Sequence, residues 1–240
     1  MSNFQYYRPN RFPPVVKNLI IINVLIFIAQ LTFGSSNPFV IENLFALHDI
    51  HSVYFKPHQL ITYMFLHGGF EHILFNMFAL WMFGSLLENS WGAKRFLQFY
   101  IICGLGAGLL HLGVLYFEMK PAWDYIHQFS QEEQERAIHG ATVVIADKWA
   151  INAPTLGASG AIFGCLAAFG YLFPNSLIYV YFMIPIKAKW FVLIYGGIEL
   201  WLGFRNSAGD SVAHFAHLGG AITGIIIVFI WNKTNRKTLY

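Results

Sequence analysis

Charged side chains are scarce in this sequence. Asp, Glu, Lys and Arg together make up 11% of its 240 residues, whereas soluble globular proteins carry about 25%. Hydrophobic residues reach 56% and aromatic residues 18%, and long stretches contain no ionisable side chain. A soluble domain of this size does not need so much apolar surface. The composition therefore predicts a polytopic membrane protein.

Basic tracts and cysteines are scarce as well. The formal net charge of +3 comes with no Lys/Arg tract that looks like a phosphate-binding stripe, so we predict no nucleic-acid partner. Cys103 and Cys165 lie inside apolar runs, where a small polarizable side chain packs as core rather than forming a disulfide. The apolar run after Pro14 lacks a small-residue cleavage site, which favours a retained signal anchor.

The motifs of several hydrolase classes are missing. Glu71-His72 lacks the second histidine of a His-Glu-x-x-His zinc metalloprotease. The paired helical aspartates that an intramembrane aspartyl protease requires are absent. Ala161 stands where the last glycine of a Gly-x-Ser-x-Gly elbow belongs, which excludes a soluble esterase. No internal repeat is visible, so we expect one domain.

Six apolar segments are present that can each cross a membrane, for which about 20 residues are needed. They lie at 16–33, 66–87, 94–117, 156–174, 186–204 and 212–232. This predicts an all-α polytopic membrane protein with six transmembrane helices. The membrane domain, 16–232, is flanked by a cytoplasmic N-terminal segment, 1–15, and a cytoplasmic tail, 233–240. The long connections 34–65 and 118–155 are expected to be outer loops with structure of their own.

The basic residues are unevenly distributed between the two sides of this bundle. With the N-terminus in the cytoplasm, ten of the 15 Lys and Arg residues lie inside and five outside. The positive-inside rule therefore favours the N-in, C-in orientation. Because transit-peptide features are lacking, we expect a bacterial plasma (inner) membrane.

Aromatic residues gather in the second long connection. Trp123, Tyr125, Phe129 and Trp149 flank the run 131–136. The pattern is typical of an amphipathic segment that lies on the outer leaflet, and a solvated helical hairpin explains it equally well.

Polar residues occur near the outer ends of the second, fourth and sixth predicted spans, which all enter the membrane from outside. A buried polar group without a partner costs roughly several kcal/mol in hydrocarbon, so such residues should face one another or a water-filled cavity. They are His67, His72, Asn76, Ser159, His214 and His217. Their convergence from three helices predicts a functional site.

Glycines flank the serine of this set. Gly160 and Gly164 form a small-xxx-small face on the fourth span, and a glycine pair of the same spacing follows His217. Such faces let two helix backbones approach closely, which would bring Ser159 within hydrogen-bonding distance of His217. Helix packing alone, with Ser159 as a filler, is the alternative explanation.

Ser159 and His217 have the chemistry of a nucleophile and its base. A serine hydroxyl is a poor nucleophile until a base takes its proton, and a neutral imidazole is the usual partner. Glu199 lies in the fifth span and Asp210 at the outer end of the sixth, but neither spacing specifies contact with His217. We therefore predict a Ser/His dyad and not a triad.

Donors for the oxyanion of a peptide-bond attack are available nearby. His72 and Asn76 are four residues apart and share a helical face. The backbone N–H of Ser159 is a third expected donor, because the first amides of a helix lack internal partners. Gly157 and Gly160 keep the approach open.

Ten histidines raise the question of a metal site. His214 and His217 could bind an ion from one helix face. No third acidic or thiolate ligand is expected nearby, so we predict no metal. No cofactor is predicted either.

Three segments, taken together and in order, make the sequence similar to the rhomboid intramembrane serine proteases. They are His67-Gly-Gly-Phe-Glu-His72-Ile-Leu-Phe-Asn76, Gly157-Ala-Ser159-Gly160-Ala-Ile-Phe163-Gly164 and Ala216-His217-Leu-Gly-Gly220-Ala-Ile-Thr-Gly224. The resemblance covers residues 16–232 and implies a six-helix rhomboid-like core with an outward-opening cavity. It implies Ser159 as nucleophile, His217 as base, and His72 and Asn76 as oxyanion donors.

Single positions add to this resemblance. Phe163 stands where the family has an aromatic residue that packs on the catalytic imidazole, and Gly220 lies on the supporting glycine face. Ala158 precedes the serine, where inactive relatives carry proline.

Two regions are less well matched. The family's Trp-Arg pair in the first loop is replaced by His58-Gln59, so the family's anchoring of that loop does not carry over. The implied lateral gate is the fifth span, 190–204, with the following loop, 205–213.

The resemblance implies an endopeptidase of the lipid bilayer that cleaves transmembrane protein substrates near the outer interface. Its substrates are expected to be single-span proteins whose helices unwind easily, because a peptide bond in an intact helix is shielded. The alternative is a non-proteolytic channel, transporter or membrane chaperone that uses the same polar cavity. The substitution Ser159→Ala separates the two.

Overall fold

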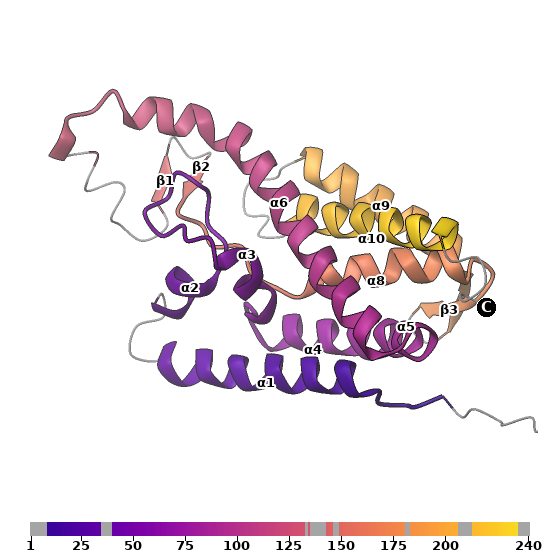
Figure 1. Cartoon of the computed structure of the whole chain (residues 1–240). Coiled ribbons are helices and arrows are strands. Elements are labelled where there is room, and N and C mark those ends of the chain that lie inside the picture. Colours follow the sequence, from indigo (N-terminus) through magenta and orange to yellow (C-terminus); the bar gives the residue numbers. More distant parts are fainter. Residues whose placement is uncertain are drawn as a thin grey trace, which may run out of the picture.

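The computed structural model of the chain describes residues 9–34, 40–132, 134, 143–145, 149–180, 183–205 and 213–234. These residues are mostly helical, with two short antiparallel hairpins (Figure 1). The elements are α1 Pro14–Gly34, α2 Val40–Phe45, α3 Gln59–Thr62, η1 Tyr63–Phe65, α4 Phe70–Ala79, η2 Leu80–Gly84, α5 Ser85–Trp91, α6 Ala93–Ile126, β1 Val143–Ile145, β2 Trp149–Ile151, α8 Ser159–Leu172, β3 Leu177–Val180, β4 Ile184–Lys187, α9 Ala188–Arg205 and α10 His214–Thr234.

Four helices of the described chain are long and apolar enough to cross a membrane. They are Pro14–Gly34, Phe70–Trp91, which joins α4, η2 and α5, Ala93–Ile126 and His214–Lys233. The chain is therefore a multi-pass integral membrane protein. α8 is apolar but has 14 residues, which gives a length of about 21 Å against a hydrocarbon layer of about 30 Å. The expected count of six spans includes α8 and α9 and stays a prediction.

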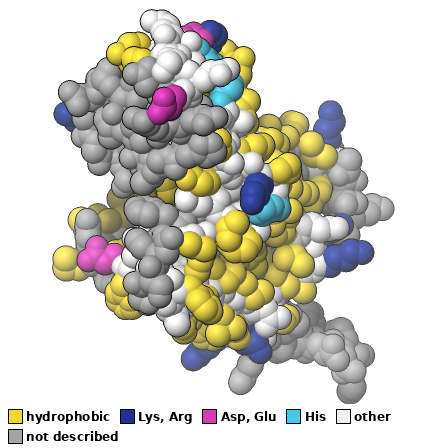
Figure 2. Space-filling model, turned by 90° about the vertical axis from the view of Figure 1, so that its left-hand side faces the viewer, with side chains coloured by type: hydrophobic (Ala, Val, Ile, Leu, Met, Phe, Trp, Pro, Cys, Tyr) yellow, Lys and Arg dark blue, Asp and Glu magenta, His cyan; other side chains and the backbone are white. Residues whose placement is uncertain are grey.

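Hydrophobic side chains cover much of the outside of the bundle. Leu31 and Phe33 on α1 and Trp201 and Phe204 on α9 are all more than half exposed. Figure 2 shows the end of the molecule at the left of Figure 1, where scattered charged side chains lie among extensive hydrophobic surface. In a soluble protein so large an apolar surface would drive association, whereas in a bilayer it faces lipid.

α8 lies at the centre of the bundle, because residues 160–170 are all buried, as expected for a helix that is hydrophobic all round. α10 runs parallel to it in close contact. A methyl group on Gly220 would overlap the Gly160 carbonyl, and one on Gly224 would lie 2.7 Å from the Gly164 carbonyl oxygen. The close approach predicted from the two glycine faces is confirmed. α6 packs against both helices (Figure 1).

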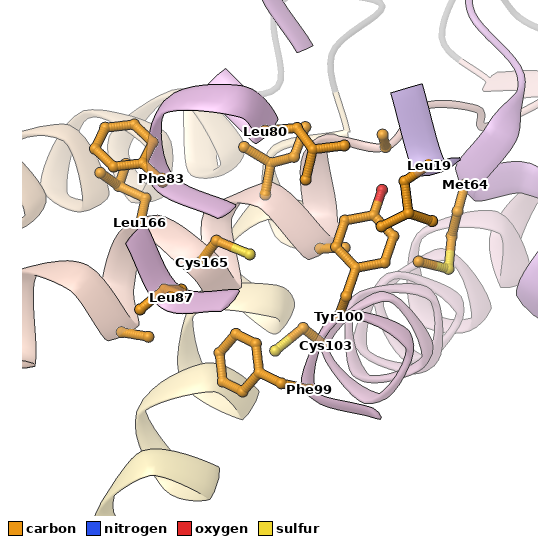
Figure 3. Packing of buried hydrophobic residues seen from close by; sticks show 14 of the residues in the cluster. Leu19, Met64, Leu80, Phe83, Leu87, Phe99, Tyr100, Cys103, Cys165 and Leu166 are labelled. Carbon is orange, nitrogen blue, oxygen red and sulfur yellow. The ribbon is translucent and has the colours of Figure 1, made fainter. Parts of the chain in front are cut away.

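The hydrophobic core lies between α6, α8, η2 and α5. Phe99, Tyr100 and Cys103 of α6 are fully buried, and Cys165 of α8 points into the same region (Figure 3). Both cysteines are free and buried, so the prediction that they pack as core residues is confirmed.

The first long loop is held by His58 and Gln59, the residues at the position of the Trp-Arg pair named above. The Gln59 side chain is fully buried, and its Nε2 donates to the Tyr54 carbonyl at 2.7 Å. His58 Nε2 lies 2.8 Å from the Leu44 carbonyl oxygen. Reciprocal backbone hydrogen bonds of 2.8 Å join Leu47 to Thr155, just before α8. The loop is therefore anchored both internally and to the segment that leads into the polar site.

The start of the second loop differs from its predicted form. α6 continues to Ile126 instead of ending near 117. Trp123 is buried, and its Nε1 donates to Asp49 Oδ1 of the first loop at 3.0 Å. This indole is therefore paired within the protein, whereas the expected amphipathic segment at 131–136 stays a prediction. Much of the run 131–136 lies outside the described residues.

Candidate active site

Ser159 and His217 meet where α8 and α10 begin. Ser159 is the first residue of α8, and His217 lies in the first turn of α10. His217 Nε2 lies 2.8 Å from Ser159 Oγ, which is hydrogen-bonding distance. Because the two helices run parallel and touch through their glycines, their first turns lie at the same level. The sequence features that bring this pair together are therefore the two glycine faces.

A carboxylate contacts the same imidazole from α9. Glu199 Oε2 lies 2.9 Å from His217 Nδ1 and 2.7 Å from His214 Nδ1. No spacing in the sequence specifies this contact, which arises because α9 packs against α8 and α10 and turns Glu199 inward. The Ser/His dyad stays a prediction. The signal in the sequence was a carboxylate within an apolar segment, which needs a partner in a membrane.

His72 approaches the serine from α4 at the position of Gly157. A methyl group on Gly157 would lie 2.9 Å from His72 Nε2 and 3.5 Å from Ser159 Oγ. The Gly157 φ of 135° is a conformation that other residues rarely adopt, and its N–H donates to the Tyr63 carbonyl at 2.9 Å. The absence of a side chain at Gly157 thus allows His72 to lie beside the start of α8.

Two N–H donors on α4 are available at this end of the bundle. His72 Nδ1 accepts a hydrogen bond of 3.2 Å from the Gly68 N–H, so the proton of a neutral imidazole resides on Nε2. Asn76, one turn later, is buried, and its Nδ2 has no hydrogen-bond partner among the described residues. Burying a donor without a partner costs free energy. An unpaired buried donor is therefore expected where a bound ligand supplies the missing acceptor.

Other predicted residues take the following positions. Phe163, one turn after Ser159 on α8, contacts the His217 ring. Gly160 lies against α10, beside the Ala216 carbonyl. Asp210 and most of the implied gate loop lie outside the described residues, and α9, the implied gate helix, is described as far as Arg205.

The cluster around Glu199 also has the composition of a metal site. Glu199, His214 and His217 offer three ligand atoms within 4.8 Å of one another, a donor set that suits Zn²⁺. The lack of a third ligand was the argument against a metal, and that argument fails. The N···O distances of 2.7 and 2.9 Å are those of hydrogen bonds, which explain the cluster without an ion. The absence of a metal stays a prediction.

Comparison with known proteins places this geometry in context. A family model described as "Rhomboid domain" matches residues 54–234. Over 75% of this chain, the sequence is 30% identical to "Rhomboid protein 1, mitochondrial" of Saccharomyces cerevisiae. Over 88% of this chain, it is 28% identical to "RHOMBOID-like protein 12, mitochondrial" of Arabidopsis thaliana. Over 84% of this chain, it is 26% identical to "Rhomboid protease GluP" of Bacillus subtilis. The matches cover 43%, 56% and 31% of these relatives.

Apolar helices around an interior hydroxyl and imidazole define a multi-pass membrane protein with a polar site inside its helix bundle. Because the family model covers most of the chain, the chain belongs to the rhomboid family. Relatives of this family include proteins named as proteases from Bacillus subtilis and Toxoplasma gondii. Other relatives are named as mitochondrial or chloroplastic, so the expected bacterial plasma membrane has no support from these names and stays a prediction.

Proposed function

We propose that the chain is an intramembrane serine endopeptidase, with Ser159 as nucleophile and His217 as general base. The observation that carries this proposal is the 2.8 Å contact between His217 Nε2 and Ser159 Oγ inside a bundle of apolar helices. Membership of a family that includes named proteases supports it. A hydroxyl and an imidazole at this distance have the geometry of an activated nucleophile.

The proposed reaction needs these two side chains and a water molecule. His217 Nε2 takes the proton of Ser159 Oγ as the oxygen attacks the peptide carbonyl carbon, and the tetrahedral intermediate carries the negative charge on the carbonyl oxygen. The imidazolium then gives its proton to the departing amine, which leaves an acyl-enzyme. Water, deprotonated by the same imidazole, hydrolyses the ester and restores Ser159.

Three N–H groups are proposed to stabilise the oxyanion. They are Asn76 Nδ2, His72 Nε2 and the backbone amide of Ser159. The unpaired state of the buried Asn76 amide supports its role, and the hydrogen bond from Gly68 to His72 Nδ1 supports that of His72. The Ser159 amide is at the first position of α8, where backbone N–H groups lack intrahelical partners. Donors fixed in advance around such an oxygen are the largest catalytic contribution in many enzymes.

The length of α8 supports cleavage near the outer interface. We propose six spans with N-in, C-in orientation, in which α8 ends at the inner boundary of the bilayer. Its length of about 21 Å would then leave Ser159 roughly 10 Å below the outer surface of a hydrocarbon layer of about 30 Å. The proposed substrates are transmembrane helices that unwind at that depth, because an intact helix shields its peptide bonds.

The test measures labelling and cleavage together, with the full chain in detergent micelles and then in liposomes. A fluorophosphonate probe should label the wild type, and a membrane-tethered reporter should be cut. Ser159→Ala and His217→Ala should lose both activities while keeping the wild-type Tm. Ser90→Ala removes an exposed helical serine that donates to the Leu86 carbonyl and should react as the wild type. Cleavage by the Ser159→Ala variant at the wild-type rate would exclude this nucleophile and leave the transporter or chaperone function.

A further inference from the structure

Glu199 is a buried carboxylate on a helix that is otherwise largely exposed. Its side chain is about 5% exposed, whereas the adjacent Ile198 and Leu200 are both more than 40% exposed. The only other buried residues of α9 are Ala188 and Gly203. Burial of a carboxylate is unfavourable unless hydrogen bonds compensate it, so the inward position of Glu199 depends on the groups that it contacts.

Those groups are two imidazoles of α10, and an ionised Glu199 determines where their protons are. An ionised carboxylate can only accept hydrogen bonds. Glu199 Oε2 therefore accepts from Nδ1–H of His217 at 2.9 Å and from Nδ1–H of His214 at 2.7 Å. A neutral imidazole has one N–H. With the proton on Nδ1, the Nε2 of His217 is a bare acceptor, and Ser159 Oγ lies 2.8 Å from it.

We propose that Glu199 is a positioning residue that completes a Ser159–His217–Glu199 array, and that His214 holds its carboxylate in place. The proposal rests on the proposed protease function. It adds a third member that the sequence reasoning did not place there. Glu199 selects the tautomer of His217 that can accept the serine proton, and it orients the ring toward Ser159.

The charges of the reaction are accommodated by this arrangement. Before attack, Glu199 is anionic and His217 is neutral. After attack, the serine proton is on His217 Nε2, the imidazole carries a positive charge, and the carbonyl oxygen carries the negative one. The Nδ1 proton stays on the imidazole and keeps its bond to Glu199, so a cation formed in a weakly polar site already has an anion beside it.

His214 gives the carboxylate its second hydrogen bond. The two histidines are three residues apart on one helix and both contact the same oxygen of Glu199. Loss of the His214 contact would leave the carboxylate with one hydrogen bond, to His217. A single bond restricts its rotation less than two bonds do. We therefore expect a smaller effect at His214 than at Glu199. We also expect rescue by asparagine, whose Nδ2–H stands close to where the histidine Nδ1–H was.

The experiment compares Glu199→Gln and Glu199→Asp with a matched buried glutamate. Glu88 of α5 is also buried, and its Oε1 and Oε2 accept from the Val15 and Val16 backbone N–H groups at 2.9 and 2.8 Å. α5 lies at the other end of the bundle from the start of α8 (Figure 1). Glu88→Gln therefore changes a buried carboxylate that binds the backbone at the start of α1. Tm, kcat and KM for the reporter, and the fluorophosphonate labelling rate, are measured for each full-length variant.

The expected result separates positioning from folding. Glu199→Gln should lower kcat and the labelling rate by roughly 10²- to 10⁴-fold with little change in KM, and Glu199→Asp should recover part of the loss. His214→Ala should lose about tenfold, the effect of one hydrogen bond, and His214→Asn should lose less. Glu88→Gln should lower Tm and keep the wild-type kcat of the folded protein.

Several outcomes would overturn the proposal. One is a folded Glu199→Gln variant with the wild-type kcat. Another is a loss of activity that follows the loss of Tm equally in Glu199→Gln and Glu88→Gln. A third is inactivation of the wild type by 1,10-phenanthroline with recovery on addition of Zn²⁺, which would assign Glu199, His214 and His217 to a metal. Failure of the protease function itself looks different, because the wild type would then neither label nor cleave.

Discussion

The imidazole of His217 lies flat against the phenyl ring of Phe163, with ring centroids 4.2 Å apart and 5° between the ring planes. Tyr195 of α9 packs on Phe163 in turn, at 5.1 Å. Phe163 follows Ser159 by one turn of α8, so a single helix supplies both the hydroxyl and the surface on which the imidazole rests. The stack restricts the ring to the plane in which Nε2 reaches Ser159 Oγ.

Substitution of Phe163 should affect turnover in proportion to the lost ring contact. Phe163→Tyr keeps the ring and should retain the wild-type kcat. Phe163→Leu keeps most of the volume but loses the stacking, worth about 0.5–1.5 kcal/mol, and should lower kcat by roughly three- to tenfold. Reporter cleavage at matched folded fraction measures both. Equal kcat in the leucine variant and the wild type would show that the stack is packing only.

Removal of the Asn76 amide should lower kcat with little effect on KM. Asn76→Ala deletes a donor proposed to act on the oxyanion, which typically costs roughly 10²- to 10³-fold in kcat. KM should change little, because the bond forms fully only in the transition state. The matched control is Asn23→Ala on α1, where a buried amide donates to the Leu19 carbonyl at 2.7 Å. The control should lower Tm and leave kcat unchanged. If Asn76→Ala lowered only Tm and Asn23→Ala lowered kcat, the oxyanion role would be contradicted.

A side chain at Gly157 should be tolerated neither by the backbone nor by the site. Gly157→Ala imposes a positive φ on a residue with a Cβ, at a cost of about 1–3 kcal/mol, and its methyl would press on His72 Nε2 at 2.9 Å. We expect a lower Tm and a loss of fluorophosphonate labelling beyond the loss of folded protein. Gly113→Ala on α6 meets no neighbour and should raise stability by about 0.5–1 kcal/mol. A fully active Gly157→Ala variant would contradict the tight fit.

The contact between α8 and α10 was predictable, whereas that of α9 was not. Glycines spaced by four residues indicate a helix face without side chains, and both α8 and α10 have such a face. The position of Glu199 depends on how far α9 is turned and shifted relative to α10, which a sequence pattern does not specify. Its presence as a carboxylate in an apolar segment showed that a partner was needed, but it did not identify His217.

The loops were less predictable because side-chain hydrogen bonds determine them. The carbonyl group that receives the Gln59 amide belongs to irregular backbone, and no periodic pattern encodes such a bond. The extension of α6 to Ile126 has a similar cause, since Ala122, Trp123 and Ile126 form a small separate core. Local contacts of this kind convert a segment that looks like a surface loop into a helix with one buried face.

The parallel packing of α8 and α10 leads to a graded prediction about Gly220 and Gly224. A methyl at Gly220 would overlap the Gly160 carbonyl, beside Ser159, whereas one at Gly224 would lie 2.7 Å from the Gly164 carbonyl, one turn further from the site. Backbone atoms cannot move aside as a side chain can. Gly220→Ala should therefore lower the free energy of unfolding by about 3 kcal/mol or more and should separate Ser159 from His217.

Gly224→Ala should also lower Tm, but its folded fraction should keep more of the labelling rate, because the helices are forced apart further from the hydroxyl. Gly196→Ala on α9, where nothing lies within 4 Å, is the control. Chemical denaturation in micelles combined with fluorophosphonate labelling gives both quantities for each variant. Equal labelling rates for folded Gly220→Ala and wild type would mean that the distance between Ser159 and His217 is not set by this helix contact.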